Sequence, residues 1–343
     1  MLKVLLAGLG VRGRHWAEVI TRSERAELVA FADPSSEALA RAIAEFGERP
    51  AFSSAAAALD SLDRVDALVL ANPPMDREAI VRLACARRLP MLIEKPLALN
   101  LAEAATLARM AETASVSLMV GLNFRYLAVT KALKRLLAEN AVGPPAFARF
   151  TYERWRDGRR PDLNDYPLVM AHPMLWEQSV HHFDLMRYVY GREPVLVQCQ
   201  TWNPSWSMYA GDSNVSALIE FDGGLRVNYQ GTWQGSWAAP GFEWRTDCAD
   251  GIITQRDEFG ALHFAHRDEA ELRCVQLPPH ERWISETTAL FAAYVDHVVD
   301  GAALQCSGRD HLMSLAMLEA CIQSSANGDG VHVRDVLPGA GKL

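Results

Sequence analysis

Short apolar runs alternate with helical patterns over the first third of the chain. The runs predict strands at 2–7, 28–32, 67–71, 91–93 and 118–120. Compact runs of this kind are typical of parallel strands that are buried on both faces. Between them lie helical patterns, and the one at 101–115 begins at Asn100, an N-cap residue, with Glu103 completing a capping box. The alternation predicts an α/β fold with a doubly wound parallel sheet, whose ligands lie at the carboxyl ends of the strands.

The pattern changes after residue 122. A helix is predicted at 130–140, a strand at 146–152 and a second helix over 176–190. Alternating apolar and polar positions then predict antiparallel strands at 195–202, 216–221, 225–233, 243–247 and 251–255. Two helices, at 285–299 and 309–326, close the chain. We therefore expect two domains, a doubly wound domain at 1–122 and an α+β domain at 123–343.

Composition and charge restrict the possible partners. The 343 residues carry a formal net charge of -8 without any run of Lys or Arg, which argues against a nucleic-acid partner. No apolar stretch approaches the roughly 20 residues that span a bilayer, so we expect no membrane association. Six cysteines lie far apart without a C-x-x-C pair, which favours reduced thiols in the cytoplasm and no structural metal.

A glycine-rich segment directly follows the first predicted strand and opens a helix. It reads Gly8-Leu9-Gly10-Val11-Arg12-Gly13, the G-x-G-x-x-G spacing. The first glycine allows a tight turn, the second lets a diphosphate approach backbone N–H groups, and the third lets helix and strand pack closely. Alone, the motif can be an incidental glycine turn. Its place after the first strand favours dinucleotide binding.

Asp33 ends the second predicted strand, where an acidic side chain accepts hydrogen bonds from the ribose hydroxyls of NAD. Asp33-Pro34-Ser35 also looks like a helix start, so Asp33 can be an N-cap, and the two roles are compatible. We expect NAD as the cofactor. Arg12 and Arg14 leave NADP possible, because either can neutralise a 2′-phosphate.

Two further segments carry candidate catalytic groups. Lys95, in Glu94-Lys95-Pro96, follows the fourth predicted strand, where it can stabilise a developing alkoxide or simply be a surface cation. Glu177, His181 and Asp184 share one face of a predicted helix at i, i+4 and i+7. Histidine titrates in the range that suits removal of a hydroxyl proton. The alternatives are a buried histidine satisfied by Asp184 or a solvated helix face.

Taken together, the motifs resemble those of the Gfo/Idh/MocA oxidoreductases over nearly the whole chain. They are GLGVRG, Asp33, LANPP at 70–74, EKP at 94–96, GLNFRY at 121–126, EQSVHHFDLMRYVYG at 177–191 and SGRDHLMSLAMLEACIQSSANG at 307–328. The resemblance implies a Rossmann domain followed by an α/β domain whose large open, mostly antiparallel sheet forms the interface of a homodimer or homotetramer. It also implies an enzyme that acts on sugars, cyclitols or related polyols with NAD or NADP.

Site residues follow from the resemblance and the patterns together. The catalytic residues are expected to be Lys95, His181 and Glu177. We expect the cofactor at Gly8, Gly10, Val11, Arg12, Gly13, Asp33, Asn72, Pro73, Glu94, Lys95 and Asn123. We expect the substrate at Lys95, Arg125, Trp155, Arg156, Tyr166, Glu177 and His181. Glu177 and Ser179 depart from the family's Asp and Gly, so the position of the bound substrate hydroxyl is open.

The loop at 154–166 is rich in aromatic side chains and planar donors, which suit a sugar ring. A solvated loop or a subunit contact is the alternative for each of its residues. The leading hypothesis is a dehydrogenase that moves a hydride between a nicotinamide and a secondary alcohol. One alternative is a glycosidase or lyase that oxidises a sugar only transiently. Another is a non-enzymatic NAD-binding regulator.

Overall fold

The computed structural model describes residues 1–161 and 163–338, and the chain divides into two compact units. Unit 1 comprises Met1–Asn123 and Glu281–Leu312, and unit 2 comprises Phe124–His280 and Met313–Leu343. A single division at residue 122 therefore does not describe the chain, because 281–312 packs with unit 1. The physical reason is helix α9 (Ser285–Asp300), whose Phe291 ring meets the buried ring of Trp16 at 6.4 Å.

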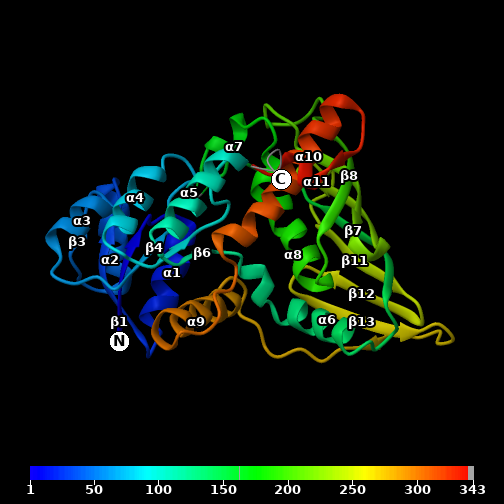
Figure 1. Cartoon of the computed structure of the whole chain (residues 1–343), viewed down its shortest axis with the longest axis horizontal. Helices are drawn as coiled ribbons and strands as arrows, with labels where there is room; N and C mark the ends of the chain where they lie inside the picture. Colours follow the sequence, from blue (N-terminus) through cyan, green and yellow to red (C-terminus); the bar gives the residue numbers. More distant parts are fainter. Residues whose placement is uncertain (162, 339–343) are drawn as a thin grey trace. The chain divides into compact units, whose positions relative to one another are not determined.

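Unit 1 is built on a six-stranded parallel sheet with the order β3-β2-β1-β4-β5-β6, which confirms the doubly wound fold (Figure 1). Its strands are β1 (Leu2–Ala7), β2 (Ala26–Ala32), β3 (Ala51–Phe52), β4 (Ala67–Leu70), β5 (Met91–Ile93) and β6 (Leu118–Val120). The helices between them are α1 (Val11–Thr21), α2 (Ser36–Phe46), α3 (Ala55–Ser61), α4 (Glu78–Ala86) and α5 (Leu101–Thr113). The apolar pattern missed only β3, which is two residues long.

The start of α5 shows how the local sequence fixes a helix boundary. The Asn100 side chain accepts a hydrogen bond from the Glu103 backbone N–H at 2.8 Å, which confirms the predicted cap. The Glu103 carboxylate accepts from the Asn100 side-chain amide at 3.2 Å. Asparagine therefore supplies both halves of the reciprocal contact through its own side chain.

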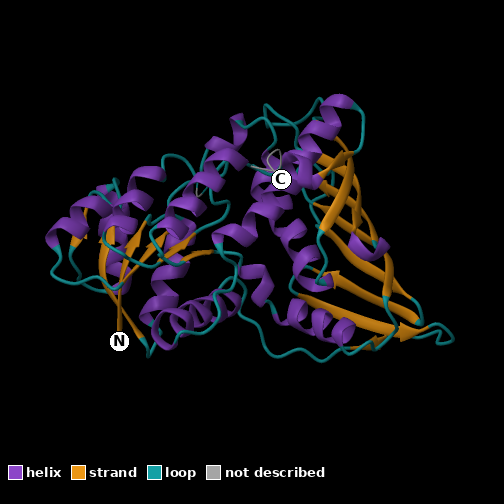
Figure 2. Cartoon of the chain, in the orientation of Figure 1, coloured by secondary structure: helices purple, strands orange, loops and turns teal. Residues whose placement is uncertain are grey.

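Unit 2 contains a nine-stranded, mostly antiparallel sheet with the order β14-β13-β12-β11-β7-β10-β9-β8-β15, in which β7 and β10 pair in parallel. Figure 2 shows the long strands of this sheet in orange. Its strands are β7 (Pro145–Glu153), β8 (Pro194–Trp202), β9 (Asn214–Phe221), β10 (Arg226–Thr232), β11 (Gly241–Cys248), β12 (Gly251–Asp257), β13 (Gly260–His266), β14 (Arg273–Cys274) and β15 (Val331–His332). Strands β13 to β15 were not predicted, since the first has an irregular apolar pattern and the others are two residues long.

The remaining helical segments lie around this sheet. They are η1 (Asn123–Tyr126), α6 (Ala128–Ala138), α7 (Tyr166–Val169), the π-helix η2 (Leu175–Ser179), α8 (Val180–Tyr190), η3 (Asp222–Gly224), α10 (Gly308–Asn327) and α11 (Val333–Val336). Helix α8 packs on one face of the sheet through rings such as Phe183 and Tyr229, whose centroids lie 5.0 Å apart. Across 1–161 and 163–338, no helix combines the length and apolarity that a membrane span needs.

The opposite face of the sheet carries a different set of side chains. One row across the strands pairs Gln198 with Leu218, Leu218 with Asn228, and Asn228 with Arg149. Leu218 is exposed, and so is Phe147 on the same face of β7. The outer face is therefore mainly polar with isolated exposed apolar side chains, whereas the α8 face is apolar and buried.

Candidate active site

The glycine turn between β1 and α1 has the geometry that a dinucleotide site requires. Gly8 has φ +91°, and a Cβ there would lie 2.5 Å from the Asn72 backbone nitrogen. A Cβ on Gly13 would lie 1.9 Å from the Gly8 carbonyl oxygen. At Gly10, by contrast, a Cβ would meet no described atom within 4 Å. The first and third glycines are needed for packing, and the second faces open space where a diphosphate can approach.

Helix α1 begins at this open space with Gly10 as its N-cap, so no side chain caps its first turn. Backbone N–H groups at such a helix start bind anions, and the helix dipole adds to the attraction. Val11, the first helical residue, is exposed there. The start of α1 is thus suited to the negative charge of a diphosphate.

Asp33 stabilises the glycine turn from the end of β2. Its Oδ2 accepts a hydrogen bond from the Leu9 N–H at 2.7 Å, and its Oδ1 accepts from the Ser35 N–H at 2.8 Å. The N-cap of α2 is Ser35, which accepts from the Ala38 N–H, so the expectation that Asp33 itself caps the helix is wrong. Each carboxylate oxygen can still accept a further hydrogen bond, as a ribose hydroxyl requires.

Both arginines that could have read a 2′-phosphate are engaged by carboxylates. The Arg12 Nε and Nη2 lie 2.9 and 2.8 Å from Glu94 Oε1, which also accepts from Trp16 Nε1 at 2.8 Å. Arg14 pairs with Glu45 through two hydrogen bonds of 3.0 and 2.9 Å. Glu94 is buried, so Arg12 compensates its charge and Trp16 adds a hydrogen bond. This arrangement favours NAD over NADP.

The loop that carries Lys95 is held by a buried arginine that the sequence analysis missed. Arg77 has no exposed surface, and its Nη1 donates to the carbonyls of Glu94, Pro96 and Leu97 at 2.7, 2.7 and 3.2 Å. Its Nη2 donates to the Asn72 carbonyl at 2.5 Å. Lys95 itself is half-buried, and the peptide bond that follows it is cis. One guanidinium thus ties the segment after β5 to the segment after β4.

The other residues expected at the cofactor differ in their surroundings. The Asn72 side-chain oxygen is buried and has no hydrogen-bond partner within the described part of the chain. Pro73 beside it is exposed. The Asn123 amide is buried and donates to Glu286 Oε1 at 3.3 Å. A buried acceptor of this kind is expected to meet a donor on a bound group, so Asn72 fits a cofactor better than Asn123 does.

In unit 2, the helix expected over 176–190 is divided. Glu177 lies in the π-helix η2, and His181 lies in the first turn of α8. The expectation of one regular helical face through Glu177, His181 and Asp184 is therefore wrong for Glu177, because a π-turn contains an extra residue. Tyr166, at the start of α7, donates its hydroxyl to Glu177 Oε1 at 2.6 Å, so the structure brings together two residues expected at the substrate.

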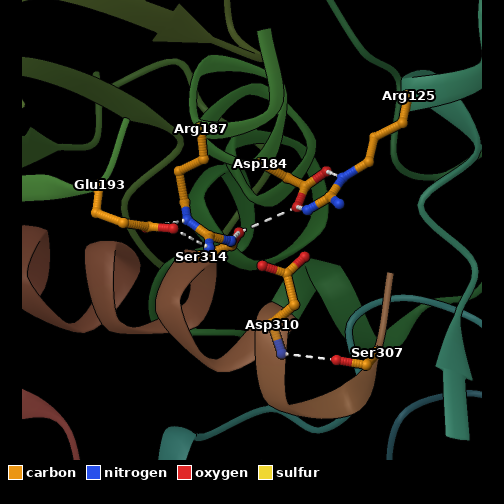
Figure 3. Close-up of polar contacts among 7 residues, drawn as sticks. All are labelled: Arg125, Asp184, Arg187, Glu193, Ser307, Asp310 and Ser314. Atoms are coloured by element: carbon orange, nitrogen blue, oxygen red, sulfur yellow. Dashed lines mark hydrogen bonds and ion pairs between the residues drawn. The ribbon is translucent and has the colours of Figure 1, made fainter. Parts of the chain in front are cut away.

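His181 is nearly buried, and its imidazole stacks on the ring of Phe124 with a centroid distance of 4.3 Å. The ring plane of the expected base is therefore fixed by an aromatic contact. Three residues further along α8, Asp184 accepts two hydrogen bonds from Arg125, at 2.7 Å to Nε and 2.5 Å to Nη2 (Figure 3). Arg125 and Asp184 are both buried, so each compensates the charge of the other.

The Asp184 contact continues into a network that ties α8 to α10. Ser314 donates to Asp184 Oδ1 at 3.1 Å and accepts from Arg187 Nη1 at 3.0 Å (Figure 3). Arg187 in turn holds Glu193 through two hydrogen bonds of 2.7 and 2.8 Å. At the beginning of α10, the Asp310 N–H donates to Ser307 Oγ at 3.1 Å. On the C-terminal side of His181, α8 is therefore held to α10 by hydrogen bonds of Asp184 and Arg187.

The loop residues expected at the substrate contact the segment after β10. Trp155 forms an isolated bridge with Gln234 and lines an open groove with Trp206 and Trp237. The Arg156 guanidinium lies 3.9 Å from the centre of the Trp233 ring, a cation–π contact. Trp233 is fully buried, which places it in the core. Asp162, in the same loop, lies outside the described residues.

Comparison with known proteins identifies the family to which this architecture belongs. Residues 2–122 match the model of the oxidoreductase family with an NAD-binding Rossmann fold, and residues 130–253 match the GFO/IDH/MocA C-terminal domain. The chain belongs to the Gfo/Idh/MocA family. The resemblance deduced from the motifs is confirmed, as are the oxidoreductase class and the NAD-binding first domain.

Individual relatives agree with this assignment over most of the chain. A D-apiose dehydrogenase of Paraburkholderia graminis is 26% identical over 97% of this chain and 90% of its own length. A myo-inositol 2-dehydrogenase of Thermotoga maritima is 29% identical over 56% of each chain. Among solved structures, an Agrobacterium radiobacter oxidoreductase in complex with NAD+, L-tartaric acid and magnesium matches with a TM-score of 0.89, at 22% identity over 98% of this chain and 99% of that one. The last match shows a shared fold.

Proposed function

We propose that this member of the family oxidises a secondary alcohol of a sugar, cyclitol or related polyol to a ketone with NAD, or catalyses the reverse reduction. The observation that carries the proposal is the near full-length similarity to a D-apiose dehydrogenase, whose named substrate is a polyhydroxylated sugar. The retention of Lys95 and His181 supports it, since an alcohol oxidation needs an electrophile near the oxygen and a base for its proton.

The residues of unit 1 fit the cofactor. The open side of Gly10 and the uncapped start of α1 suit the diphosphate, Asp33 suits the ribose hydroxyls, and the buried Asn72 oxygen suits a donor on the same molecule. The hydrogen bond between Arg12 and Glu94 supports the turn, and Lys95 directly follows Glu94 in the sequence. Bound NAD supplies the acceptor for the hydride.

In this proposal His181 accepts the proton of the substrate hydroxyl, and Lys95 donates a hydrogen bond to the same oxygen, where negative charge develops. Glu177, oriented by the Tyr166 hydroxyl, accepts a hydrogen bond from a neighbouring substrate hydroxyl. Arg125 fixes α8 through Asp184. Trp155 and Arg156 offer an aromatic face and a planar donor to a sugar ring.

A panel of neutral and acidic sugars and polyols, screened with NAD and with NADP for absorbance of the reduced nicotinamide, tests the proposal. The expected result is one equivalent of NADH for each equivalent of ketone formed. Product without stoichiometric NADH would instead indicate transient oxidation followed by elimination. An absence of turnover across a panel that includes D-apiose and myo-inositol, together with tight NAD binding, would favour a regulatory protein.

We also propose a cytoplasmic homo-oligomer in which a second copy covers the outer face of the unit 2 sheet. Support comes from the polar side chains of that face and from the exposed side chains of Phe147 and Leu218. Light scattering after size exclusion is expected to show a dimer or tetramer that Phe147→Glu weakens. Val169→Glu, at an exposed apolar residue of α7, is the control. A monomeric wild type contradicts the proposed interface.

A further inference from the structure

A chain of hydrogen bonds through four side chains surrounds the π-turn η2. Gln178 Nε2 lies 3.1 Å from His182 Nε2, and His182 Nδ1 lies 2.8 Å from the Tyr229 hydroxyl. The Tyr229 hydroxyl lies 2.8 Å from Ser179 Oγ, which donates to the Met174 carbonyl at 3.1 Å. Ser179, His182 and Tyr229 are at most 2% exposed, so water does not compete for these contacts.

The Ser179 contact with the Met174 carbonyl gives the hydrogen bonds of this chain a direction. A serine hydroxyl has a single proton, and Ser179 uses it on the Met174 carbonyl, so Tyr229 must donate to Ser179. The Tyr229 oxygen then accepts from His182 Nδ1–H, and His182 Nε2 accepts from the Gln178 amide. The reverse order would leave the Met174 carbonyl without this donor.

The protonation of His182 agrees with that direction. Complete burial lowers the pKa of His182 to about 3, so its imidazole is neutral at pH 7 and carries one proton, which the chain places on Nδ1. Burial also raises the pKa of Tyr229 well above its ordinary value, so the phenol keeps the proton that it donates. Every member of the chain is neutral, and each proton on the path has one acceptor.

The chain ends on the backbone that makes η2 a π-turn. The Val180 N–H donates to the Leu175 carbonyl, five residues back, and the Ser179 hydroxyl donates to the carbonyl of Met174, directly before η2. A serine side chain that bonds a carbonyl of the preceding turn changes the local helix geometry. Ser179 therefore stabilises the wide turn η2, which contains Glu177.

We propose that Ser179, Tyr229 and His182 are positioning residues that hold η2 in its wide form and so fix the directions of Glu177 and His181 toward the substrate. The inference rests on the catalytic roles proposed above. Glu177 directly precedes Gln178 and His181 directly precedes His182, so each proposed substrate contact is the chain neighbour of a member of the hydrogen-bond chain.

Kinetics of three variants test the proposal. Ser179→Ala and Tyr229→Phe each remove a hydroxyl of the chain. Tyr190→Phe is the control, because Tyr190 is a half-buried tyrosine of unit 2 whose hydroxyl lies 2.8 Å from both Thr246 Oγ1 and Trp244 Nε1. We expect Ser179→Ala and Tyr229→Phe to lower kcat about 10-fold to 100-fold and to raise KM for the preferred polyol of the panel. Tyr190→Phe is expected to keep kcat and KM within about twofold of the wild type, although its loss of Tm is similar to that of Tyr229→Phe.

Equal losses of kcat in Tyr229→Phe and Tyr190→Phe would show that the chain is merely structural and would overturn the proposal. The same holds if Ser179→Ala retains wild-type kcat and KM. The dissociation constant of NADH is expected to stay unchanged in all three variants, because the cofactor residues lie in unit 1.

Nitrogen NMR of the 15N-histidine-labelled protein tests the positioning without any turnover. His182, assigned from a His182→Gln variant, is expected to be the neutral Nδ1–H tautomer from pH 8 to pH 5. The ring signals of His181 are expected to shift in Ser179→Ala and Tyr229→Phe but not in Tyr190→Phe. An Nε2–H tautomer of His182 contradicts the inferred direction. If these NMR results hold while the wild type oxidises no polyol, the proposed function fails and the positioning of His181 stands.

Discussion

The turn expected to hold the cofactor in unit 1 and the turn expected to carry the base in unit 2 are stabilised in opposite ways. In unit 1, glycines permit the turn, and ionised side chains hold it and the loops beside it: Glu94 binds Arg12, Asp33 binds the Leu9 N–H, and Arg77 binds four carbonyls of the segments after β4 and β5. In unit 2, the π-turn beside His181 is held by neutral side chains that pass hydrogen bonds from one to the next.

This difference determines which of the two turns can be predicted from the sequence. A turn that depends on missing Cβ atoms leaves a local motif of glycines. A turn that depends on a chain through Tyr229 leaves none, because that residue lies on β10, far from η2 in the sequence. The difference between the two turns also predicts how each unit is destabilised. Unit 1 is expected to lose stability when an ionised side chain is removed, and unit 2 when a buried imidazole is protonated.

The largest expected effect separates chemistry from binding. We expect His181→Ala and Lys95→Ala each to lower kcat about 100-fold to 10,000-fold, since each removes a group that acts on the reacting oxygen. NADH titration by fluorescence is expected to give a wild-type dissociation constant for His181→Ala. Lys131→Ala, at a lysine of α6, is the control for a lost surface cation. A His181→Ala variant that loses NADH affinity would contradict the assignment of cofactor binding to unit 1 and of proton transfer to unit 2.

A slightly smaller effect is expected when the buried Arg77 guanidinium is removed from unit 1. Arg77→Met leaves the carbonyls of Glu94, Pro96, Leu97 and Asn72 without their donor in a fully buried place. We expect a loss of about 3 to 5 kcal/mol in the free energy of unfolding and a weaker affinity for NADH. Arg82→Ala, which removes an exposed ion pair with Glu78 on α4, is expected to cost within about 0.5 kcal/mol. Denaturant melts that rank the two variants equally would contradict this role of Arg77.

Acid is expected to weaken unit 2 through His182. Its pKa is about 3 in the folded chain against 6.5 as the ordinary value, so below pH 6.5 the unfolded chain binds the proton and unfolding is favoured. This stability is present in full above pH 6.5 and is lost as the pH falls toward 3, with about 2 kcal/mol of it lost between pH 6.5 and pH 5. His15, whose pKa burial lowers to about 4, acts in the same direction. Urea melts at both pH values are expected to show a smaller difference for His182→Gln than for the wild type.

The smallest effect concerns the choice of cofactor. Asp33→Asn keeps an oxygen for the turn but removes the charge that excludes a 2′-phosphate, so we expect about a 10-fold loss of NAD affinity and a relative gain for NADP. Asp60→Asn, at an exposed aspartate paired with Arg87, is the control. A wild type that already prefers NADP would mean that Asp33 serves only the Leu9 and Ser35 N–H groups.

The sequence predicted the parts of the structure that depend on neighbours along the chain. The Asn100 cap, the glycine turn and strands such as β5 follow from local patterns, and the structure has them. Arg77 could not be predicted, because its four acceptors come from two separate loops. The π-turn could not be predicted either, since periodicity in 176–190 fits a regular α-helix and the extra residue depends on the Ser179 hydroxyl and on Tyr229.

The composition of unit 1 has a consequence for how the protein is made. Chains emerge from the ribosome N-terminus first, and compact units fold as their residues become available. Unit 1 needs 281–312 in addition to its first 123 residues, and Phe291 from that segment covers the ring of Trp16. All of Phe124–His280 is synthesised in between. During translation the NAD-binding unit therefore starts before unit 2, and part of its core stays uncovered until helix α9 has been made.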